Sequence, residues 1–147
     1  MCKSVVGIGM DDLPASLIVA LAVQLSCQAF KVVYYSLRER RFQPRLFFSS
    51  GKMPSAHSAF VTALTVSVGI RNGFSSDLFA VAAVFAFIII HDALRVRGAL
   101  QRLIRILQEQ EIRGTEELPA DIGHSVPEVV TGIAVGLVLG AGLSVLL

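Results

Sequence analysis

The chain has 147 residues, of which 54% are hydrophobic and 16% are charged, and its mean hydropathy is +0.68. Soluble domains carry about 25% charged residues, so this composition excludes an ordinary soluble protein and indicates one membrane-embedded domain over residues 1–147. The formal net charge of +2 is too small to indicate a nucleic-acid partner, and two cysteines, Cys2 and Cys27, provide neither a disulfide framework nor a metal-ligand spacing.

Four stretches approach the roughly 20 apolar residues that a helix needs to cross the hydrocarbon core of a bilayer. The first covers residues 13–37 and contains Pro14, which suits a first helical turn. The second covers residues 54–70, and its short length and its Ser and Thr residues predict that it packs among the other helices. The third covers residues 75–94 and the fourth covers residues 127–147. We therefore predict an all-α integral membrane protein built as a four-helix bundle.

The segment between the third and fourth stretches begins with an amphipathic pattern. Leu100, Leu103, Ile104 and Leu107 recur at helical spacing, and Gln101, Arg102, Arg105 and Gln108 lie opposite them. This pattern predicts a helix that lies in the membrane interface. Residues 109–121 beyond it are acidic and predict a solvated loop, either a lid over a lipid headgroup or a plain connector.

Three glycines share one face of the fourth stretch: Gly132, Gly136 and Gly140. Small residues at this spacing let two helix backbones approach closely in lipid, so we interpret them as a packing stripe. The same stripe is also a candidate surface for a homo-oligomer.

Polar residues interrupt the apolar stretches near particular helix ends. Successive membrane helices alternate in direction, so the end of the first, the start of the second, the end of the third and the start of the fourth share one side of the bilayer. The interrupting residues fall at those four ends, in chain order Lys31, Ser55 and His57, Asp92 and Arg97, His124 and Glu128. Because ionisable groups in a membrane are costly, their convergence predicts a functional site. Within it, Asp92 is expected to orient Arg97 as an ion pair or to take part in proton transfer.

The residue types on this side suit phosphate chemistry. Two helix N-termini supply unpaired N–H groups and positive dipole ends, and Lys31 and Arg97 add cations, of which arginine matches the phosphate oxygens. Two histidines allow one imidazole to attack phosphorus and the other to protonate the leaving oxygen. Glu128 follows His124 by one helical turn and is within reach to hold its ring. Ser125 and Glu128 also fit a capping box, which is a structural role, and Lys31 has the alternative role of reaching the lipid headgroups.

Three segments closely resemble the divergent type-2 phosphatidic acid phosphatase (PAP2) family: SGKMPSAHSA at residues 50–59, DALRVR at 92–97 and GHSVPEV at 123–129. That family is related to acid phosphatases and vanadium haloperoxidases, and the resemblance extends from Gln28 to the C-terminus of the chain. It implies a set of phosphate-binding residues, which are Lys31, Ser55 and Arg97. It also implies a catalytic set, which is His124 as nucleophile, His57 as general acid and Glu128 as the group that orients the nucleophile.

The chain departs from the family pattern at several positions. Lys52 and Arg95 stand where the divergent family usually has glycine, and these extra cations are expected to widen the phosphate clamp or to tune the choice of substrate. Ala56 replaces a glycine of the wider superfamily. Arg38 is spaced from Lys31 like the superfamily's first arginine, although no proline follows it.

We predict that the chain hydrolyses a lipid phosphate monoester through a phosphohistidine intermediate, with no metal or cofactor, and that phosphatidylglycerophosphate and phosphatidic acid are the first candidate substrates. Basic residues are concentrated in the two loops on the side of the site, so the site should face the cytoplasm or its organellar equivalent. Three alternatives remain open. They are an isoprenoid phosphate or diphosphate substrate, a metal-dependent enzyme with His57, Asp92, His124 and Glu128 as ligands, and a non-catalytic membrane protein that binds lipid phosphate.

Overall fold

The computed structural model describes residues 13–48, 52–110 and 125–147, and all regular elements within these residues are helices. The helices are α1 (Ala15–Glu39), a short 3-10 helix (Pro44–Phe48), α2 (Ala56–Asn72), α3 (Asp77–Leu94), α4 (Val96–Glu109) and α5 (Val126–Leu146). The all-α prediction is therefore confirmed for these residues, and the predicted bounds of the four apolar helices differ from the observed ones by at most two residues.

Among the described residues, three helical stretches are long and apolar enough to cross a membrane, judged by their length and composition. They are α1, the 33-residue stretch Asp77–Glu109 formed by α3 and α4, and α5. With 17 residues, α2 falls short of them, so its expected role as a fourth membrane span stays a prediction.

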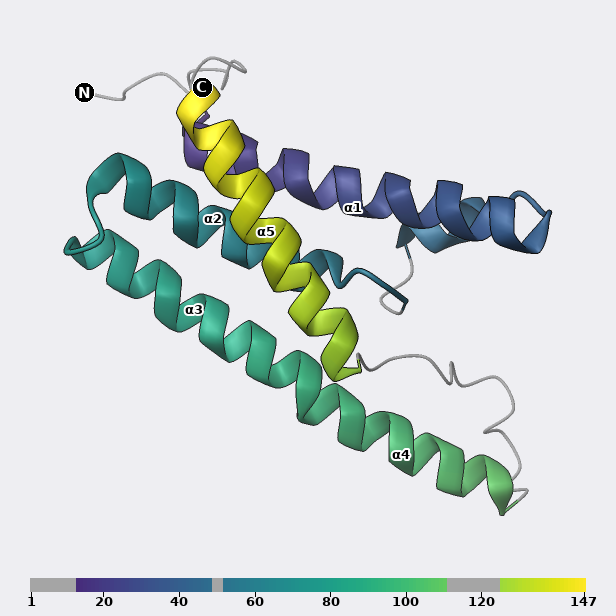
Figure 1. Cartoon of the computed structure of the whole chain (residues 1–147). Coiled ribbons are helices and arrows are strands. Elements are labelled where there is room, and N and C mark those ends of the chain that lie inside the picture. The colour runs from purple at the N-terminus through teal and green to yellow at the C-terminus, as the bar shows by residue number, and fades with distance from the viewer. Residues whose placement is uncertain (1–12, 49–51, 111–124) are drawn as a thin grey trace, which may run out of the picture.

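The central helix of the structure is α2, which packs against α1, α3 and α5 (Figure 1). Its buried positions carry small side chains, including Ala59, Ala63 and Ser67, each with no exposed surface. Small residues let neighbouring helices approach on several sides. The prediction that this helix packs among the others is confirmed.

The glycine ladder of α5 lies directly against α2. A Cβ atom added at Gly132 would come within 2.4 Å of the Ser55 carbonyl oxygen, and one added at Gly136 would come within 2.5 Å of the Ala59 carbonyl oxygen. At Gly140, the Cα atom of Ala63 would lie at 2.7 Å. The interpretation as a packing stripe is confirmed. This placement does not support the stripe as a homo-oligomer surface, because α2 of the same chain already occupies it.

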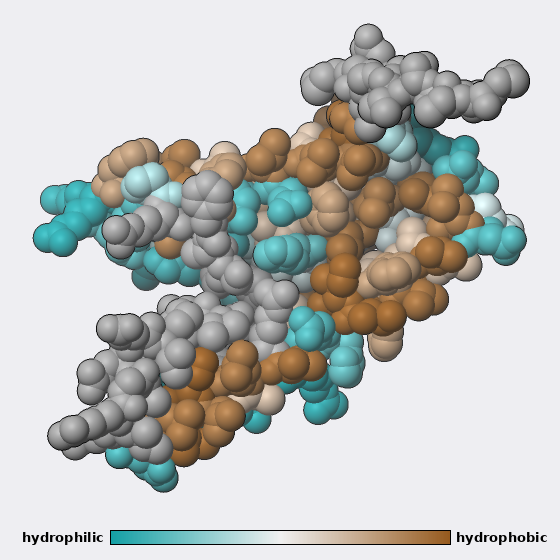
Figure 2. Space-filling model, turned by 180° about the vertical axis from the view of Figure 1, so that it is seen from behind, coloured by the Kyte–Doolittle hydropathy of each residue, from teal (hydrophilic) through white to brown (hydrophobic). Residues whose placement is uncertain are grey.

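On the face seen in Figure 2, hydrophobic side chains cover much of the surface, and hydrophilic ones lie at its ends and in patches near its middle. Large exposed examples lie on each long helix, such as Leu37 on α1 (74% exposed), Phe87 on α3 (70%) and Val138 on α5 (71%). Helices that expose such side chains need an apolar medium around them, and their backbone hydrogen bonds are satisfied internally, as a lipid environment requires. The outward surface therefore fits contact with a bilayer.

The predicted amphipathic helix is present as α4, and it continues the line of α3 in Figure 1. Arg95 at the junction keeps a right-handed helical backbone. The helical hydrogen bonds run through it, because its N–H donates to the carbonyl oxygen of His91 at 2.9 Å and its own carbonyl oxygen accepts from the N–H of Ala99 at 3.0 Å. Leu100 and Leu103 remain exposed on the apolar face of α4. The helix is thus confirmed, whereas its position in the membrane interface stays a prediction.

Candidate functional site

Ser55 joins the first turn of α2 to the first turn of α5. It is fully buried, and its Oγ accepts a hydrogen bond from the N–H of Ser58 at 3.4 Å and lies 2.9 Å from the Ser58 Oγ. Its backbone N–H donates to the carbonyl oxygen of Glu128 at 3.0 Å. The N-termini of two helices therefore meet at this serine, and both present the positive ends of their dipoles there.

Glu128 also stabilises the start of α5 through the predicted capping box. One carboxylate oxygen accepts a hydrogen bond from the backbone N–H of Ser125 at 3.3 Å, and Pro127 occupies the first turn. The capping box is confirmed. This role holds the Glu128 side chain at the N-terminus of the helix, where a negative charge is favourable.

Lys31 is buried inside the helix bundle, with 1% of its surface exposed. Its ammonium group interacts electrostatically with the carboxylate of Glu128, and Cys27 lies one turn earlier on α1. A buried cation of this kind does not fit the alternative in which Lys31 reaches out to the lipid headgroups. Gln28 on the same face of α1 is 8% exposed, and among the described residues no group donates a hydrogen bond to its Oε1 atom. The structure thus brings together Lys31 from α1, Ser55 from α2 and Glu128 from α5, which we call the polar cluster.

The remaining described members of the predicted catalytic set lie at the expected helix ends. His57 is the second residue of α2, two positions after Ser55, and it is half-buried. Asp92 is half-buried in the last turn of α3. In Figure 1 the end of α3 passes near the start of α5. Among the described residues, no group of three or more His, Cys, Asp and Glu side chains is arranged to hold a metal ion.

Lys52 makes its contacts with the end of α1. Its Nζ atom lies 3.5 Å from Oε1 of Glu39 and 4.4 Å from the ring centroid of Tyr35. Its backbone has a positive φ of 72°, a conformation that non-glycine residues adopt rarely. A role of Lys52 in phosphate binding stays a prediction. In that role the ammonium group would leave Glu39 and pair with the phosphate of the substrate.

The structure shows no contact with the polar cluster for three further predicted residues, among the parts of them that it describes. Arg95 is exposed at the junction of α3 and α4. The backbone of Arg97 belongs to the first turn of α4, but its side chain lies outside the described part. His124, the predicted nucleophile, precedes α5 and lies outside the described residues. Their functional roles therefore remain predictions from the sequence.

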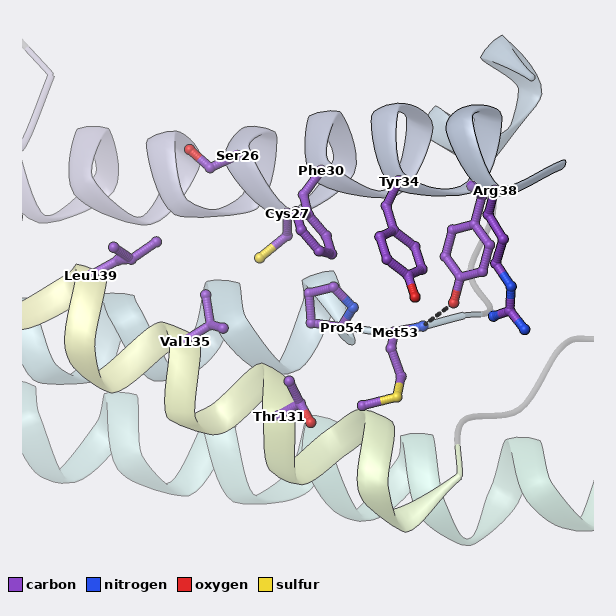
Figure 3. A pocket seen from close by; sticks show the side chains of 11 residues that line it. Ser26, Cys27, Phe30, Tyr34, Arg38, Met53, Pro54, Thr131, Val135 and Leu139 are labelled. Atoms are coloured by element: carbon purple, nitrogen blue, oxygen red, sulfur yellow. Dashed lines mark hydrogen bonds between the residues drawn. The ribbon is translucent and has the colours of Figure 1, made fainter. Parts of the chain in front are cut away.

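An apolar groove of about 650 Å³ runs between α1 and α5 (Figure 3). Cys27, Phe30 and Tyr34 line it from α1, and Thr131, Val135 and Leu139 line it from α5. Pro54 lies between the two helices, and Arg38 and Tyr35 are at the end where α1 finishes. No sequence motif marks this groove, because its lining residues come from three elements and share no spacing in the sequence. Only the position of Arg38 relative to Lys31 pointed to this end of α1.

Comparison with known proteins agrees with a membrane protein. Over 81 residues the chain is 43% identical to a protein of Bacillus subtilis described as "Uncharacterized membrane protein YuiD". The aligned region covers 55% of this chain and about half, 51%, of that relative. No solved structure matches the chain. The model of the Divergent PAP2 family matches residues 14–139, and the chain therefore belongs to the divergent PAP2 family.

Proposed function

We propose that the protein is a membrane phosphatase that hydrolyses a lipid phosphate monoester. The observation that carries the proposal is the polar cluster, in which Lys31 is buried beside Glu128 and beside the joined N-termini of α2 and α5. Burying an ammonium group among apolar helices costs several kcal/mol unless charges or hydrogen bonds compensate it. A phosphate that binds there would gain from the cation and from both helix dipoles. Membership of the PAP2 family supports the same chemistry.

In the proposed reaction, Lys31, Ser55 and Arg97 hold the phosphate group, with Arg95 and Lys52 nearer the rim. The imidazole of His124 attacks phosphorus while His57 gives its proton to the leaving alcohol oxygen, so a phosphohistidine forms as the P–O bond of the ester breaks. His57, now neutral, then takes a proton from a water molecule that attacks the phosphohistidine. Inorganic phosphate leaves, and His124 is regenerated.

Two carboxylates position these groups in the proposal. Glu128 accepts the Ser125 N–H with one oxygen, and we assign to its carboxylate the further task of orienting the ring of His124. Asp92 at the end of α3 is assigned to hold Arg97 in place. These two assignments rest on the sequence positions of His124 and Arg97.

The lipid substrate is proposed to be phosphatidylglycerophosphate or phosphatidic acid, with an isoprenoid phosphate or diphosphate as the alternative. Basic residues in the connections beside the site favour a site on the cytoplasmic side of the membrane or its organellar equivalent. In that arrangement α2 joins α1, α3 and α5 as the fourth span of the bundle, and α4 lies at the interface near the headgroups.

The test measures phosphate release by the purified full-length protein from a panel of lipid phosphates. His124→Ala should abolish release from every lipid, vanadate should inhibit the wild-type protein, and EDTA should leave the rate unchanged. His91→Ala is the matched control, because His91 is exposed on α3 and stacks on Phe87, and it should retain full activity. Unchanged turnover by His124→Ala would remove the proposed nucleophile.

The same assay separates the two rival functions. Loss of activity with EDTA and its return with one added metal would favour a metal-dependent enzyme that uses His57, Asp92, His124 and Glu128. Saturable binding of lipid phosphate without turnover would favour a non-catalytic binding protein, which would keep the polar cluster for recognition alone.

A further inference from the structure

The groove between α1 and α5 has the length of one lipid chain in one leaflet. Its lining on α1 extends from Ser26 to Arg38, and twelve residues of helix correspond to about 18 Å at 1.5 Å per residue. The hydrocarbon of a single leaflet is roughly 15 Å thick, half of the bilayer core. A hydrocarbon chain lying along α1 would therefore find lining side chains over its whole leaflet depth.

The two ends of the groove differ in chemistry. Cys27, Val135 and Leu139 make the inner part apolar, whereas Tyr34, Tyr35 and Arg38 line the end where α1 finishes (Figure 3). Binding sites with this combination take a ligand with an apolar body and fix its orientation through a few polar groups at one end. The lining therefore fits an amphiphile whose anionic end lies on the Arg38 side of its hydrocarbon chain.

The groove also runs beside the polar cluster. Cys27 lies one turn before Lys31 on α1, Pro54 directly precedes Ser55, and Thr131 lies one turn after Glu128 on α5. Each of the three elements that line the groove thus contributes, within one helical turn, a residue of the polar cluster.

We propose that this groove binds one hydrocarbon chain of the lipid phosphate, with its phosphate held at the polar cluster, on the Arg38 side of the chain, and its chain end towards Leu139. The proposal rests on the proposed function, because it assigns to the same site the recognition of the lipid part of the substrate. Any second chain of the lipid stays in the bilayer. The enzyme then selects a lipid phosphate over a water-soluble phosphate ester through the chain in the groove.

The chain contains no tryptophan, so one introduced indole reports on one place. Phe30→Trp puts the probe in the groove, and Phe85→Trp, on the exposed surface of α3 away from the groove, is its control. Each purified full-length variant, in detergent, is titrated with a lipid phosphate whose chain carries bromine, which quenches indole fluorescence on contact. Quenching of Phe30→Trp should saturate and should be reversed by the same lipid phosphate without bromine. The quenching of Phe85→Trp should rise linearly with the brominated lipid, and the lipid phosphate without bromine should not reverse it.

A second pair of variants tests whether the groove itself is responsible. Ser26→Phe adds a ring to the groove, whereas Leu25→Phe places the same ring on the neighbouring exposed position, which does not line it. In the Phe30→Trp background, Ser26→Phe should weaken binding by roughly tenfold or more and Leu25→Phe should leave it nearly unchanged. The corresponding lipid alcohol, which has no phosphate, should bind at least roughly tenfold more weakly than the lipid phosphate.

Several outcomes would overturn the proposal. The first two are a linear response of Phe30→Trp like that of the control and an equal effect of Ser26→Phe and Leu25→Phe. The others are equal binding of the lipid alcohol and the lipid phosphate, and a dimer of the purified protein in which the second copy covers the groove. The readout needs no turnover, so the two proposals fail separately. Saturable quenching without hydrolysis of any lipid would refute the proposed phosphatase activity but support lipid binding in the groove. Hydrolysis without saturable quenching would refute lipid binding in the groove but support the phosphatase activity.

Discussion

Replacing Gly132 with alanine tests the close approach of α5 to α2 at the polar cluster. The new Cβ would lie 2.4 Å from the Ser55 carbonyl oxygen, whereas ordinary contacts begin at 3.4 Å. The start of α5 must therefore withdraw by about 1 Å, and overpacking of this kind costs about 1–3 kcal/mol. The higher helix propensity of alanine returns at most about 1 kcal/mol. The same withdrawal stretches the 3.0 Å hydrogen bond between the Ser55 N–H and the Glu128 carbonyl oxygen beyond a normal length.

The assay is thermal unfolding of the full-length protein in detergent, followed by circular dichroism, together with saturable binding of lipid phosphate. Gly132→Ala should lower the unfolding midpoint by several degrees and weaken binding. Gly140→Ala should lower the midpoint but spare binding, because its Cβ would meet Ala63, far from Ser55 along α2. Gly142→Ala is the matched control, since no described atom lies within 4 Å of its added Cβ. Equal midpoints for Gly132→Ala and Gly142→Ala would refute the packing argument.

Two further predictions concern lysines in different surroundings. Lys31→Met should abolish phosphate release and lipid phosphate binding while shifting the unfolding midpoint little, because the desolvation cost removed with the buried ammonium offsets its lost attraction to Glu128; unchanged binding would contradict the role of Lys31. Lys52→Ala should leave the midpoint nearly unchanged, because the Lys52 side chain is 31% exposed and pairs with the exposed Glu39, and exposed ion pairs contribute little. Because Lys52 lies at the rim of the proposed phosphate site, its loss should lower phosphate release by less than about tenfold. A loss of phosphate release by tenfold or more would instead place Lys52 in the phosphate clamp.

The helices and their caps could be predicted from the sequence because the signals are local. Apolar length and turn residues defined the four apolar helices within two residues of their bounds. Ser125 and Glu128 make the predicted capping box, since both partners lie within one turn. The glycine spacing of α5 predicted a close helix contact, although only the structure shows that α2 is the partner.

Features that depend on how separate segments meet could not be predicted in this way. The periodicity of α4 is visible in the sequence, but its direction depends on the backbone of Arg95, which stays helical and lets α4 continue α3. The contacts of Lys52 with Glu39 and Tyr35 depend on a turn in which Lys52 has a positive φ. Lysine adopts this conformation rarely. The groove needs α1 and α5 to lie at a particular separation, which no motif encodes. For His124, outside the described residues, the sequence remains the basis of its assignment.

The burial of α2 has a consequence for how the protein is made. This helix has few exposed side chains, and its buried surface carries Thr62 and Ser67. Insertion of α2 alone into the bilayer would therefore gain little free energy. Its close partner along the glycine ladder, α5, leaves the ribosome after all the other described helices. A nascent chain that lacks α5 therefore has no Glu128 beside Ser55 and no helix on the side of the groove opposite α1. Both the polar cluster and the groove form together, when the last of these helices docks, so a chain that lacks α5 has neither.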